Sequence, residues 1–70
     1  MRPGSKAVVT SPIPECLEMG AVVKLLMKVD QGDEFLWEGH RYKAGTDFWW
    51  VSEEGGEPIL IRARDLEAAP

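Results

Sequence analysis

The sequence has little of the chemistry that most enzymes and metal sites require. Its 70 residues include one cysteine, Cys16, and one histidine, His40. A structural zinc site usually takes four Cys or His ligands, and a thiol–imidazole pair has to lie within hydrogen-bond distance to act in nucleophilic catalysis. We expect Cys16 and His40 to lie in different loops. The sequence therefore predicts no catalytic residues, no metal and no cofactor. A lone cysteine cannot form an internal disulfide, which favours a reducing, cytoplasmic location.

Long apolar runs and phosphate-binding loops are absent as well. A membrane-spanning helix needs about 18 apolar residues in a row, and no run in this sequence approaches that length. The N-terminal segment has no apolar core of secretory-signal length, so we expect no targeting segment and no membrane partner. The pair Gly55-Gly56 is followed by Glu57-Pro58, which supplies a carboxylate and no proline N–H. A nucleotide-binding loop is therefore not expected.

Charge is unevenly distributed along the chain. Residues 1–28 contain four basic and two acidic residues, whereas residues 29–70 contain four basic and ten acidic ones, which gives formal charges of +2 and −6. Proteins that bind duplex nucleic acids usually gather Lys and Arg on one face. The acidic second part disfavours a nucleic-acid partner and is compatible with a mixed, solvated surface.

Length and turn residues predict one small all-β domain. A chain of 70 residues has room for a single hydrophobic core, and we expect one domain over residues 1–70, ordered from about residue 4 to about residue 67. Short β-branched or aromatic runs bounded by Gly, Pro and Asp predict strands at residues 7–10, 21–29, 34–38, 46–52 and 59–62. The connecting segments are predicted as a proline-containing loop at 11–20, turns at 30–33 and 53–56, a polar loop at 40–44, a one-turn helix at 63–67 and a frayed end at 68–70.

The segment 21–29 has the clearest alternation. Apolar residues occur at every second position from Val23 to Val29 and would share one face of a strand. Its Leu, Met and Lys content makes a two-turn helix the alternative, but three valines and the preceding glycine favour the strand. We interpret three residues as packing residues, namely Met19, Met27 and Cys16.

The order of these elements resembles an SH3-like barrel. The resemblance rests on a proline-rich loop after the first strand, a long second strand, the adjacent pair Trp49-Trp50, a glycine turn at 53–56 and the helical turn at 63–67. In such domains the aromatic pair opens the third strand, the glycine turn forms the distal hairpin and the helical turn precedes the last strand. The resemblance implies a small SH3-like barrel of about five antiparallel strands, whose closure would protect the sheet edges.

Two further resemblances bear on function. Residues 3–9, followed by residues 19–23, are similar to the glycine-centred two-strand unit of KOW-type barrels, which implies contact with RNA or protein. The layout also looks like that of small uncharacterised phage and prophage proteins, a resemblance that implies no known activity. A KOW-like nucleic-acid-binding barrel is therefore one alternative, and its candidate residues are Lys6, Lys24, Lys28, Arg41 and Lys43.

The adjacent tryptophans supply the main candidate for a binding surface. Neighbouring residues of a strand point to opposite faces, so we expect Trp50, with Phe48, to lie in the core and Trp49 to face outward. A large exposed ring is unusual unless something covers it. Either residues 38–45 fold over Trp49, or Trp49 is an exposed anchor for a partner. As an anchor, Trp49→Ala would weaken binding and leave thermal unfolding nearly unchanged.

The leading hypothesis is a non-catalytic binding module with a protein partner. The segment 40–43 is the one basic cluster with an aromatic residue inside it, and it is compatible with a solvated loop or with contact to nucleic acid. The candidate binding residues are Trp49, Trp37, Tyr42, Arg41 and Lys43. A further alternative is an acidic inhibitor of a nucleic-acid-binding protein. Self-association through the aromatic strand into a homo-oligomer would add stability to so small a domain.

Overall fold

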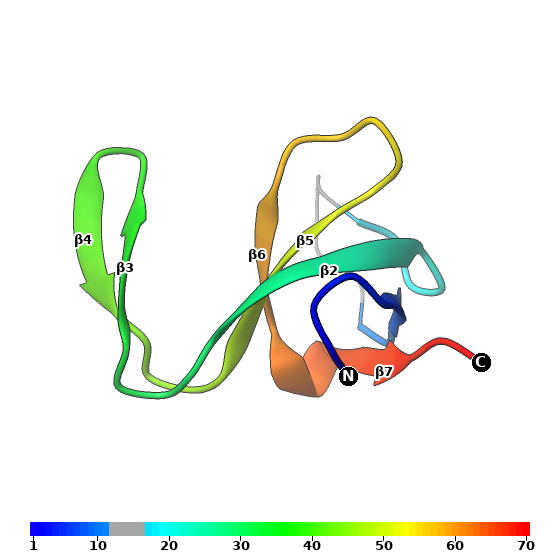
Figure 1. The fold of residues 1–70 in the computed structure, drawn as a ribbon, viewed down its shortest axis with the longest axis horizontal. Helices are drawn as coiled ribbons and strands as arrows, with labels where there is room; N and C mark the ends of the chain where they lie inside the picture. The colour runs from blue at the N-terminus through cyan, green and yellow to red at the C-terminus, as the bar shows by residue number, and fades with distance from the viewer. Residues whose placement is uncertain (12–16) are drawn as a thin grey trace.

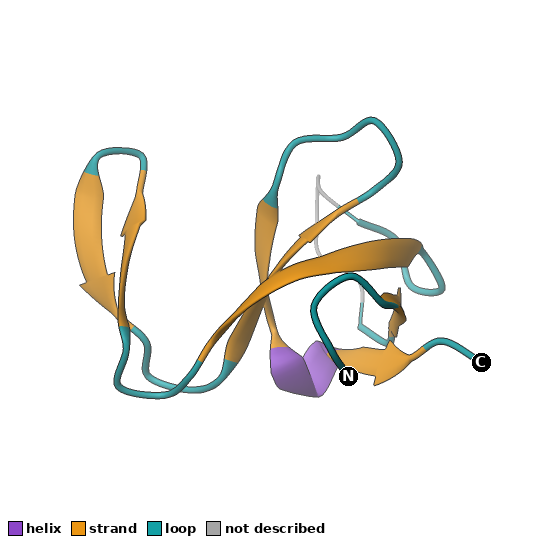
Figure 2. Ribbon diagram, viewed as in Figure 1, coloured by secondary structure: helices purple, strands orange, loops and turns teal. Residues whose placement is uncertain are grey.

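In the computed structural model, which describes residues 1–11 and 17–70, the chain folds into short β-strands joined by turns and loops (Figure 1; Figure 2). Within these residues, seven strands follow one another: β1 (Lys6–Val9), β2 (Val22–Val29), β3 (Glu34–Trp37), β4 (His40–Lys43), β5 (Phe48–Ser52), β6 (Ile59–Arg62) and β7 (Leu66–Ala68). A 3₁₀ turn, η1 (Ala63–Asp65), connects β6 to β7. The predicted all-β class is confirmed. Cys16, interpreted as a packing residue, and most of the predicted proline loop lie outside the described residues.

The strands form two antiparallel sheets of unequal size. The larger sheet has five strands in the order β6-β5-β2-β1-β7, and the smaller sheet pairs β3 with β4. The larger sheet has the predicted number of about five antiparallel strands, but the predicted strand at 34–38 belongs to the smaller sheet, and β7 takes the fifth place. Its third strand along the chain, β5, contains the tryptophan pair, and the 3₁₀ turn η1 precedes its last strand, β7. The element order expected for the larger sheet is therefore present.

The β3–β4 hairpin is the main departure from the sequence prediction. A polar loop is predicted at 40–44, and this prediction is wrong, because residues 40–43 form β4 and pair with β3 along its whole length. The turn between the two strands consists of Glu38 and Gly39, with φ angles of 51° and 81°. Two successive residues of positive φ give a tight turn whose twist matches that of the flanking strands. The sequence gives no strand signal for β4, because all of its side chains are exposed and polar residues are therefore tolerated on both faces.

The end of the chain is more ordered than the sequence suggests. The helical turn predicted at 63–67 is present over Ala63–Asp65 as η1, whereas residues 66 and 67 belong to β7. Ala68, predicted to fray, also belongs to β7 and lies opposite Ala7 of β1. The N–H of Ala69 donates to the carbonyl of Lys6, with an N···O distance of 3.1 Å. The strand β7 thereby covers an edge of β1 that would otherwise leave main-chain groups unpaired.

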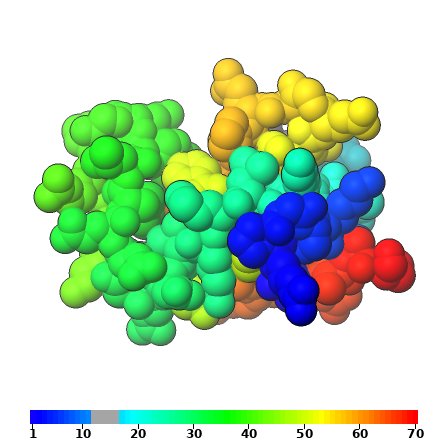
Figure 3. Space-filling model, viewed as in Figure 1, coloured from blue at the N-terminus to red at the C-terminus, as the bar shows by residue number. Residues whose placement is uncertain are grey.

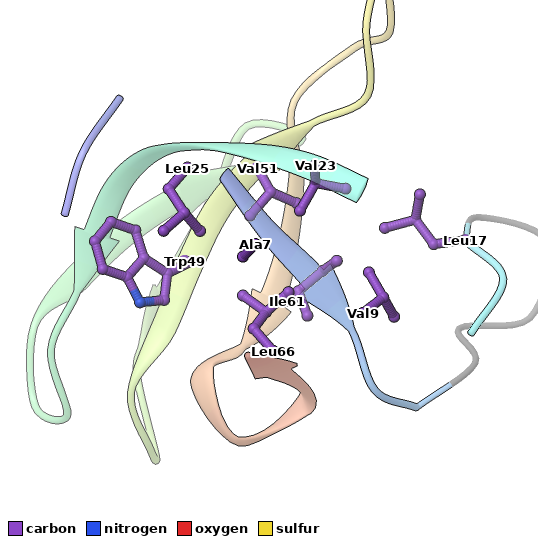
Figure 4. Close-up of a cluster of buried hydrophobic side chains, with 9 residues drawn as sticks. All are labelled: Ala7, Val9, Leu17, Val23, Leu25, Trp49, Val51, Ile61 and Leu66. Carbon is purple, nitrogen blue, oxygen red and sulfur yellow. The ribbon is translucent and has the colours of Figure 1, made fainter. Parts of the chain in front are cut away.

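The hydrophobic core lies on one face of the larger sheet and draws on all five of its strands (Figure 4). Its members are nearly inaccessible to solvent: Ala7, Val9, Leu17, Val23, Leu25, Trp49, Val51, Ile61 and Leu66. None of these residues comes from β3 or β4. Side chains from every strand of one sheet can meet in a single cluster only if the sheet curls around them, as strand twist favours.

The two tryptophans of β5 occupy the faces opposite to those predicted. They do point to opposite faces, as expected, but Trp49 is the core residue, with 3% of its surface exposed, and Trp50 lies on the outer face. Trp49 lies opposite Ile61 of β6, and Val51, two residues further along β5, belongs to the same core. The inner face of β5 and β6 therefore consists of buried branched residues together with the ring of Trp49.

A β-bulge in β2 changes which residues of that strand face the core. The register between β2 and β5 shifts between Leu25 and Met27, which leaves Leu26 as an extra residue. An extra residue reverses the alternation beyond it, so Met27 lies opposite Trp50 on the outer face. The single apolar face predicted for 21–29 therefore ends at Leu25. The interpretation of Met27 as a packing residue is wrong, because 57% of its surface is exposed.

Candidate functional site

The outer face of the larger sheet carries apolar side chains beside the β3–β4 hairpin. Met27 of β2, Trp50 of β5 and Leu60 of β6 lie opposite one another in the strand register and form a row across three strands. The hairpin adds further exposed apolar residues next to this row. We define the outer apolar surface as Met27, Trp37, Tyr42 and Trp50.

Aromatic contacts hold the hairpin against the larger sheet. The rings of Trp37 and Trp50 meet edge to face, with centroids 6.4 Å apart and planes at 78°. The ring of Phe35 lies 6.2 Å from that of Phe48 in β5 and stacks on Tyr42 at 5.6 Å. Such pairs each contribute about 0.5–1.5 kcal/mol beyond the burial of their area. The position of the hairpin therefore depends on side-chain packing between the two sheets.

Trp49 does not belong to this surface. Because it is a core residue, both predictions for it are wrong, namely that it is an exposed anchor and that residues 38–45 cover its outward ring. A covering contact exists, but it is made to Trp50 by Trp37 of β3. One ring of an adjacent pair enters the core, and the other is covered in part by a separate element.

The other four predicted site residues lie on the hairpin and are divided between its two faces. Trp37 and Tyr42 belong to the face that contacts the larger sheet, and 46% and 47% of their surfaces remain exposed. Arg41 and Lys43 flank Tyr42 in β4 and therefore point away from that sheet. The Arg41 guanidinium Nε lies 3.8 Å from Glu34 Oε2. The structure thus brings the two aromatic candidates together and separates the two basic ones from them.

Two residues of the outer apolar surface are missing from the sequence-based candidates: Met27 and Trp50. The bulge at Leu26 hides Met27, because a strict alternation places it with the core. Leu36 is 66% exposed, but it lies opposite Arg41 in the register and therefore points away from the larger sheet, as Arg41 does. Met19, also interpreted as a packing residue, is exposed instead. The aromatic content of β3 indicates Trp37, but it gives no signal for Met27 or Trp50.

An open groove lies between β2 and β3. Its apolar lining consists of Met27, Val29, Phe35, Leu36 and Trp50, and its polar lining consists of Lys28, Asp33 and Glu34. In the space-filling view the hairpin forms a lobe beside the larger sheet (Figure 3). The groove therefore lies between the larger sheet, which carries Met27 and Trp50, and the hairpin.

Carboxylates dominate the turn that joins β2 to β3, at one end of the groove. The Lys28 ammonium Nζ lies 3.3 Å from Asp30 Oδ1 and 3.9 Å from Asp47 Oδ2. The Asp33 carboxylate accepts the main-chain N–H of Asp30 at 3.0 Å, and the Asp47 carboxylate accepts that of Gln31 at 2.8 Å. The positive charge of Lys28 is thus compensated by two carboxylates, and this end of the groove is negative.

The basic residues considered for nucleic-acid binding do not form one patch. Lys6 and Lys24 lie opposite each other on β1 and β2, whereas Arg41 and Lys43 project from the hairpin, and the two strands concerned, β1 and β4, lie at opposite ends of the view in Figure 1. Lys28 is paired with carboxylates. A continuous track of cations along a phosphate backbone is therefore not formed by these five residues.

Within residues 1–11 and 17–70, no three His, Cys, Asp or Glu residues are grouped so as to hold a metal ion. Across the same residues, no helix has the length and apolar content needed to cross a membrane. No protein-family model matches the chain, and no curated protein or solved structure matches it significantly.

Proposed function

We propose that this protein is a cytoplasmic, non-catalytic binding module whose partner is another protein, bound through the outer apolar surface. One observation carries the proposal: three large apolar residues, Met27, Trp37 and Tyr42, each keep about half of their surface exposed beside the half-buried Trp50. The same chain buries Trp49 almost completely, so it has a core in which large rings fit. Contiguous exposed apolar residues of this kind mark interaction sites in monomeric proteins.

The chemistry of the surface suits recognition of a protein. Trp and Tyr are enriched among residues that carry most of the energy of protein interfaces, and Met adapts to irregular partners. Trp37 and Trp50 already restrict each other through their edge-to-face contact. A partner would therefore bind rings that are partly pre-organised, which lowers the entropy cost of association.

The proposal has a second part, that the domain is an SH3-like barrel, and the layout of the larger sheet supports it. Its chain order places the tryptophan pair in the third strand and a 3₁₀ turn before the last strand, and its strands are all antiparallel. These are the positions that the resemblance implies. In the proposed protein the β3–β4 hairpin replaces a simple connection between the second and third strands, and it supplies part of the binding surface. The likeness to small phage and prophage proteins concerns the same layout.

Affinity capture with matched variants tests the proposal. The immobilised protein would be incubated with an extract of the cells that express it, alongside Trp37→Ala and the control Met19→Ala. Met19 is exposed and apolar but is not part of the outer apolar surface. We expect Trp37→Ala to reduce capture of a specific partner at least tenfold and Met19→Ala to leave it unchanged. Equal capture by all three proteins would contradict the proposal.

Self-association is the second outcome that the same variants resolve. Sedimentation velocity at increasing protein concentration would show whether the chain forms dimers. Dimers that dissociate with Trp37→Ala and persist with Met19→Ala would assign the outer apolar surface to a second copy of the chain. A foreign partner on this surface would then be excluded, because the surface would be occupied.

A further inference from the structure

The smaller sheet leaves an unpaired strand edge beside the groove. In the part of the chain that the structure describes, β3 pairs with β4 and with no other strand, and residues 27–29 of β2 pair with β5 alone. In the view of Figure 1, β3 lies between β4 and the larger sheet. The groove that β2 and β3 line is therefore bordered by the unpaired edge of β3.

The hydrogen-bonding pattern of the hairpin shows which main-chain groups are available at this edge. The N–H of Ala44 donates to the carbonyl of Asp33 at 2.8 Å. In an antiparallel ladder, residues that bond to the neighbouring strand alternate with residues whose N–H and C=O point away from it. Counting from Asp33, the main-chain groups of Glu34 and Leu36 point away from β4. Each offers one donor and one acceptor to a further strand.

We infer that the partner binds as an extended segment that adds to β3 as a third strand of the smaller sheet, with apolar and basic side chains in alternation. This inference rests on the proposed function and specifies how the outer apolar surface is used. A two-stranded sheet is marginal in water, whereas three strands with an apolar face are stable. Addition of a strand to an exposed edge is an established mode of peptide recognition, in which main-chain hydrogen bonds give affinity and alternate side chains give specificity.

The side-chain chemistry of the segment follows from the lining of the groove. Alternate residues of an added strand would face the larger sheet, where Met27 and Trp50 line the groove, and these residues have to be apolar. The residues between them would lie on the face of Glu34. Opposite charges on neighbouring strands stabilise a sheet. Lys or Arg is therefore expected at the intervening positions.

The charge around the groove favours a basic segment over an acidic one. Lys28 is compensated by Asp30 and Asp47. The cations beside Glu34 come from β4, the strand on the side away from the groove: Lys43 lies opposite Glu34 in the register, and the Arg41 Nε lies 3.8 Å from Glu34 Oε2. The carboxylate of Asp33 also lines the groove. A basic segment would therefore associate faster and more specifically than an acidic one, since complementary charge raises association rates and rejects wrong partners.

The test uses a synthetic eight-residue peptide that alternates valine and arginine, with an acetylated N-terminus and an amidated C-terminus. Titration into ¹⁵N-labelled protein, followed by NMR, reports both affinity and location. We expect saturable shifts at the amides of residues 27–29 and 34–37, and at least tenfold weaker binding when glutamate replaces arginine. Shifts that are absent, or confined to other strands, would overturn the inference.

Backbone N-methylation separates strand addition from simple apolar contact. Two peptides, N-methylated on the odd or on the even residues, each lose the hydrogen-bond donors of one edge only. Strand addition requires that one of them bind at least tenfold more weakly and the other bind nearly as the parent does. Equal affinities for all three peptides would show that no main-chain ladder forms, and would overturn the inference.

A matched pair of protein variants tests the same point from the other side. Leu36→Pro removes an N–H that points away from β4, a position where proline is tolerated on an edge strand, and Leu36→Val keeps that N–H. We expect at least tenfold weaker binding of the valine–arginine peptide by Leu36→Pro and a small change with Leu36→Val. Circular dichroism would show whether each variant folds. If Leu36→Pro does not fold, the N-methylated peptides alone test whether the segment adds to β3 as a strand.

The two proposals fail in distinguishable ways. If a cellular partner depends on Trp37 and the valine–arginine peptide does not bind, the outer apolar surface stands and strand addition is wrong. If neither the partner nor the peptide depends on this side of the molecule, both proposals are wrong. If the peptide binds at β3 and cellular capture is unaffected by Trp37→Ala, strand addition stands and the wider surface does not carry the interaction.

Discussion

The indole rings of Trp37 and Trp50 meet edge to face at 6.4 Å, and this contact joins two sheets whose strands do not pair with each other. The hairpin that contains Trp37 has no ladder to the larger sheet among the described residues. Its orientation depends on this contact and on that between Phe35 and Phe48. The outer apolar surface is therefore formed by packing between elements, and it changes if the hairpin moves.

The three tryptophans should differ sharply in their contribution to stability. Trp49→Ala removes a ring from the core, and truncation of a buried Trp costs about 3–5 kcal/mol. Trp37→Ala removes a half-exposed ring and one aromatic contact, which we expect to cost about 1 kcal/mol. Urea denaturation monitored by circular dichroism measures both values. A smaller loss for Trp49→Ala than for Trp37→Ala would show that the faces of β5 are assigned wrongly.

Most of the strands could be predicted from the sequence because their signals are local. β-branched and aromatic runs bounded by turn residues locate β1, β2, β5 and β6, and the turn residues near Gly55 locate the hairpin between β5 and β6. The strand β4 could not be found in this way, because its residues are polar and exposed on both faces. β4 can be identified only from its pairing with β3 across the turn at Glu38-Gly39.

The candidate site was harder to predict than the fold, since it depends on one inserted residue. Period-two alternation shows that the side chains of Trp49 and Trp50 point to opposite faces of β5. It does not show which face belongs to the core, because both faces carry apolar residues. The bulge at Leu26 then moves Met27 to the outer face, and a bulge leaves no composition signal here. Face assignment therefore required the register between β2 and β5, which the sequence of either strand alone does not contain.

The turn at Glu38-Gly39 should control how often the hairpin opens. Glu38 has a φ of 51° and Gly39 a φ of 81°, conformations that favour Asn at the first position and Gly at the second. We expect Glu38→Asn to stabilise the hairpin by about 0.5–1 kcal/mol and Gly39→Ala to destabilise it by about 1–2 kcal/mol. Hydrogen exchange of the β3 and β4 amides measures local opening.

The exchange experiment contains its own control. Amides of β1 and β7 lie in the larger sheet, and they should respond to neither substitution beyond any change in global stability. Faster exchange in β1 and β7 than in β3 and β4 after Gly39→Ala would mean that the hairpin does not open as a separate unit.

Lys6 and Lys24 should destabilise the sheet by mutual repulsion. They are direct neighbours across β1 and β2, and in the described residues no carboxylate lies within 4.0 Å of either ammonium. We expect Lys6→Glu to raise the free energy of unfolding by about 0.2–1 kcal/mol, with the gain decreasing as salt screens the new attraction. Lys6→Gln removes the repulsion without adding an attraction, so its free energy of unfolding should lie between those of the wild type and Lys6→Glu. A Lys6→Glu protein less stable than Lys6→Gln at low salt would contradict this account.

Asp65 should be the most important carboxylate for stability among the described residues. It is the buried charged residue of that part of the chain, its Oδ2 accepts a hydrogen bond from the Arg62 Nε at 2.8 Å, and its carbonyl accepts the N–H of Thr10 at 2.8 Å. A hydrogen bond between charged groups contributes about 1.5–3 kcal/mol, and the partial exposure of Arg62 places the expected loss for Asp65→Ala near the lower end of that range. Glu67→Ala is the matched control, because Glu67 is a nearby carboxylate that is exposed on β7, and its removal should change stability by less than about 0.5 kcal/mol. Thermal and urea unfolding of the two variants would measure the difference, and equal losses would show that the ion pair at the 3₁₀ turn does not hold β7 against β1.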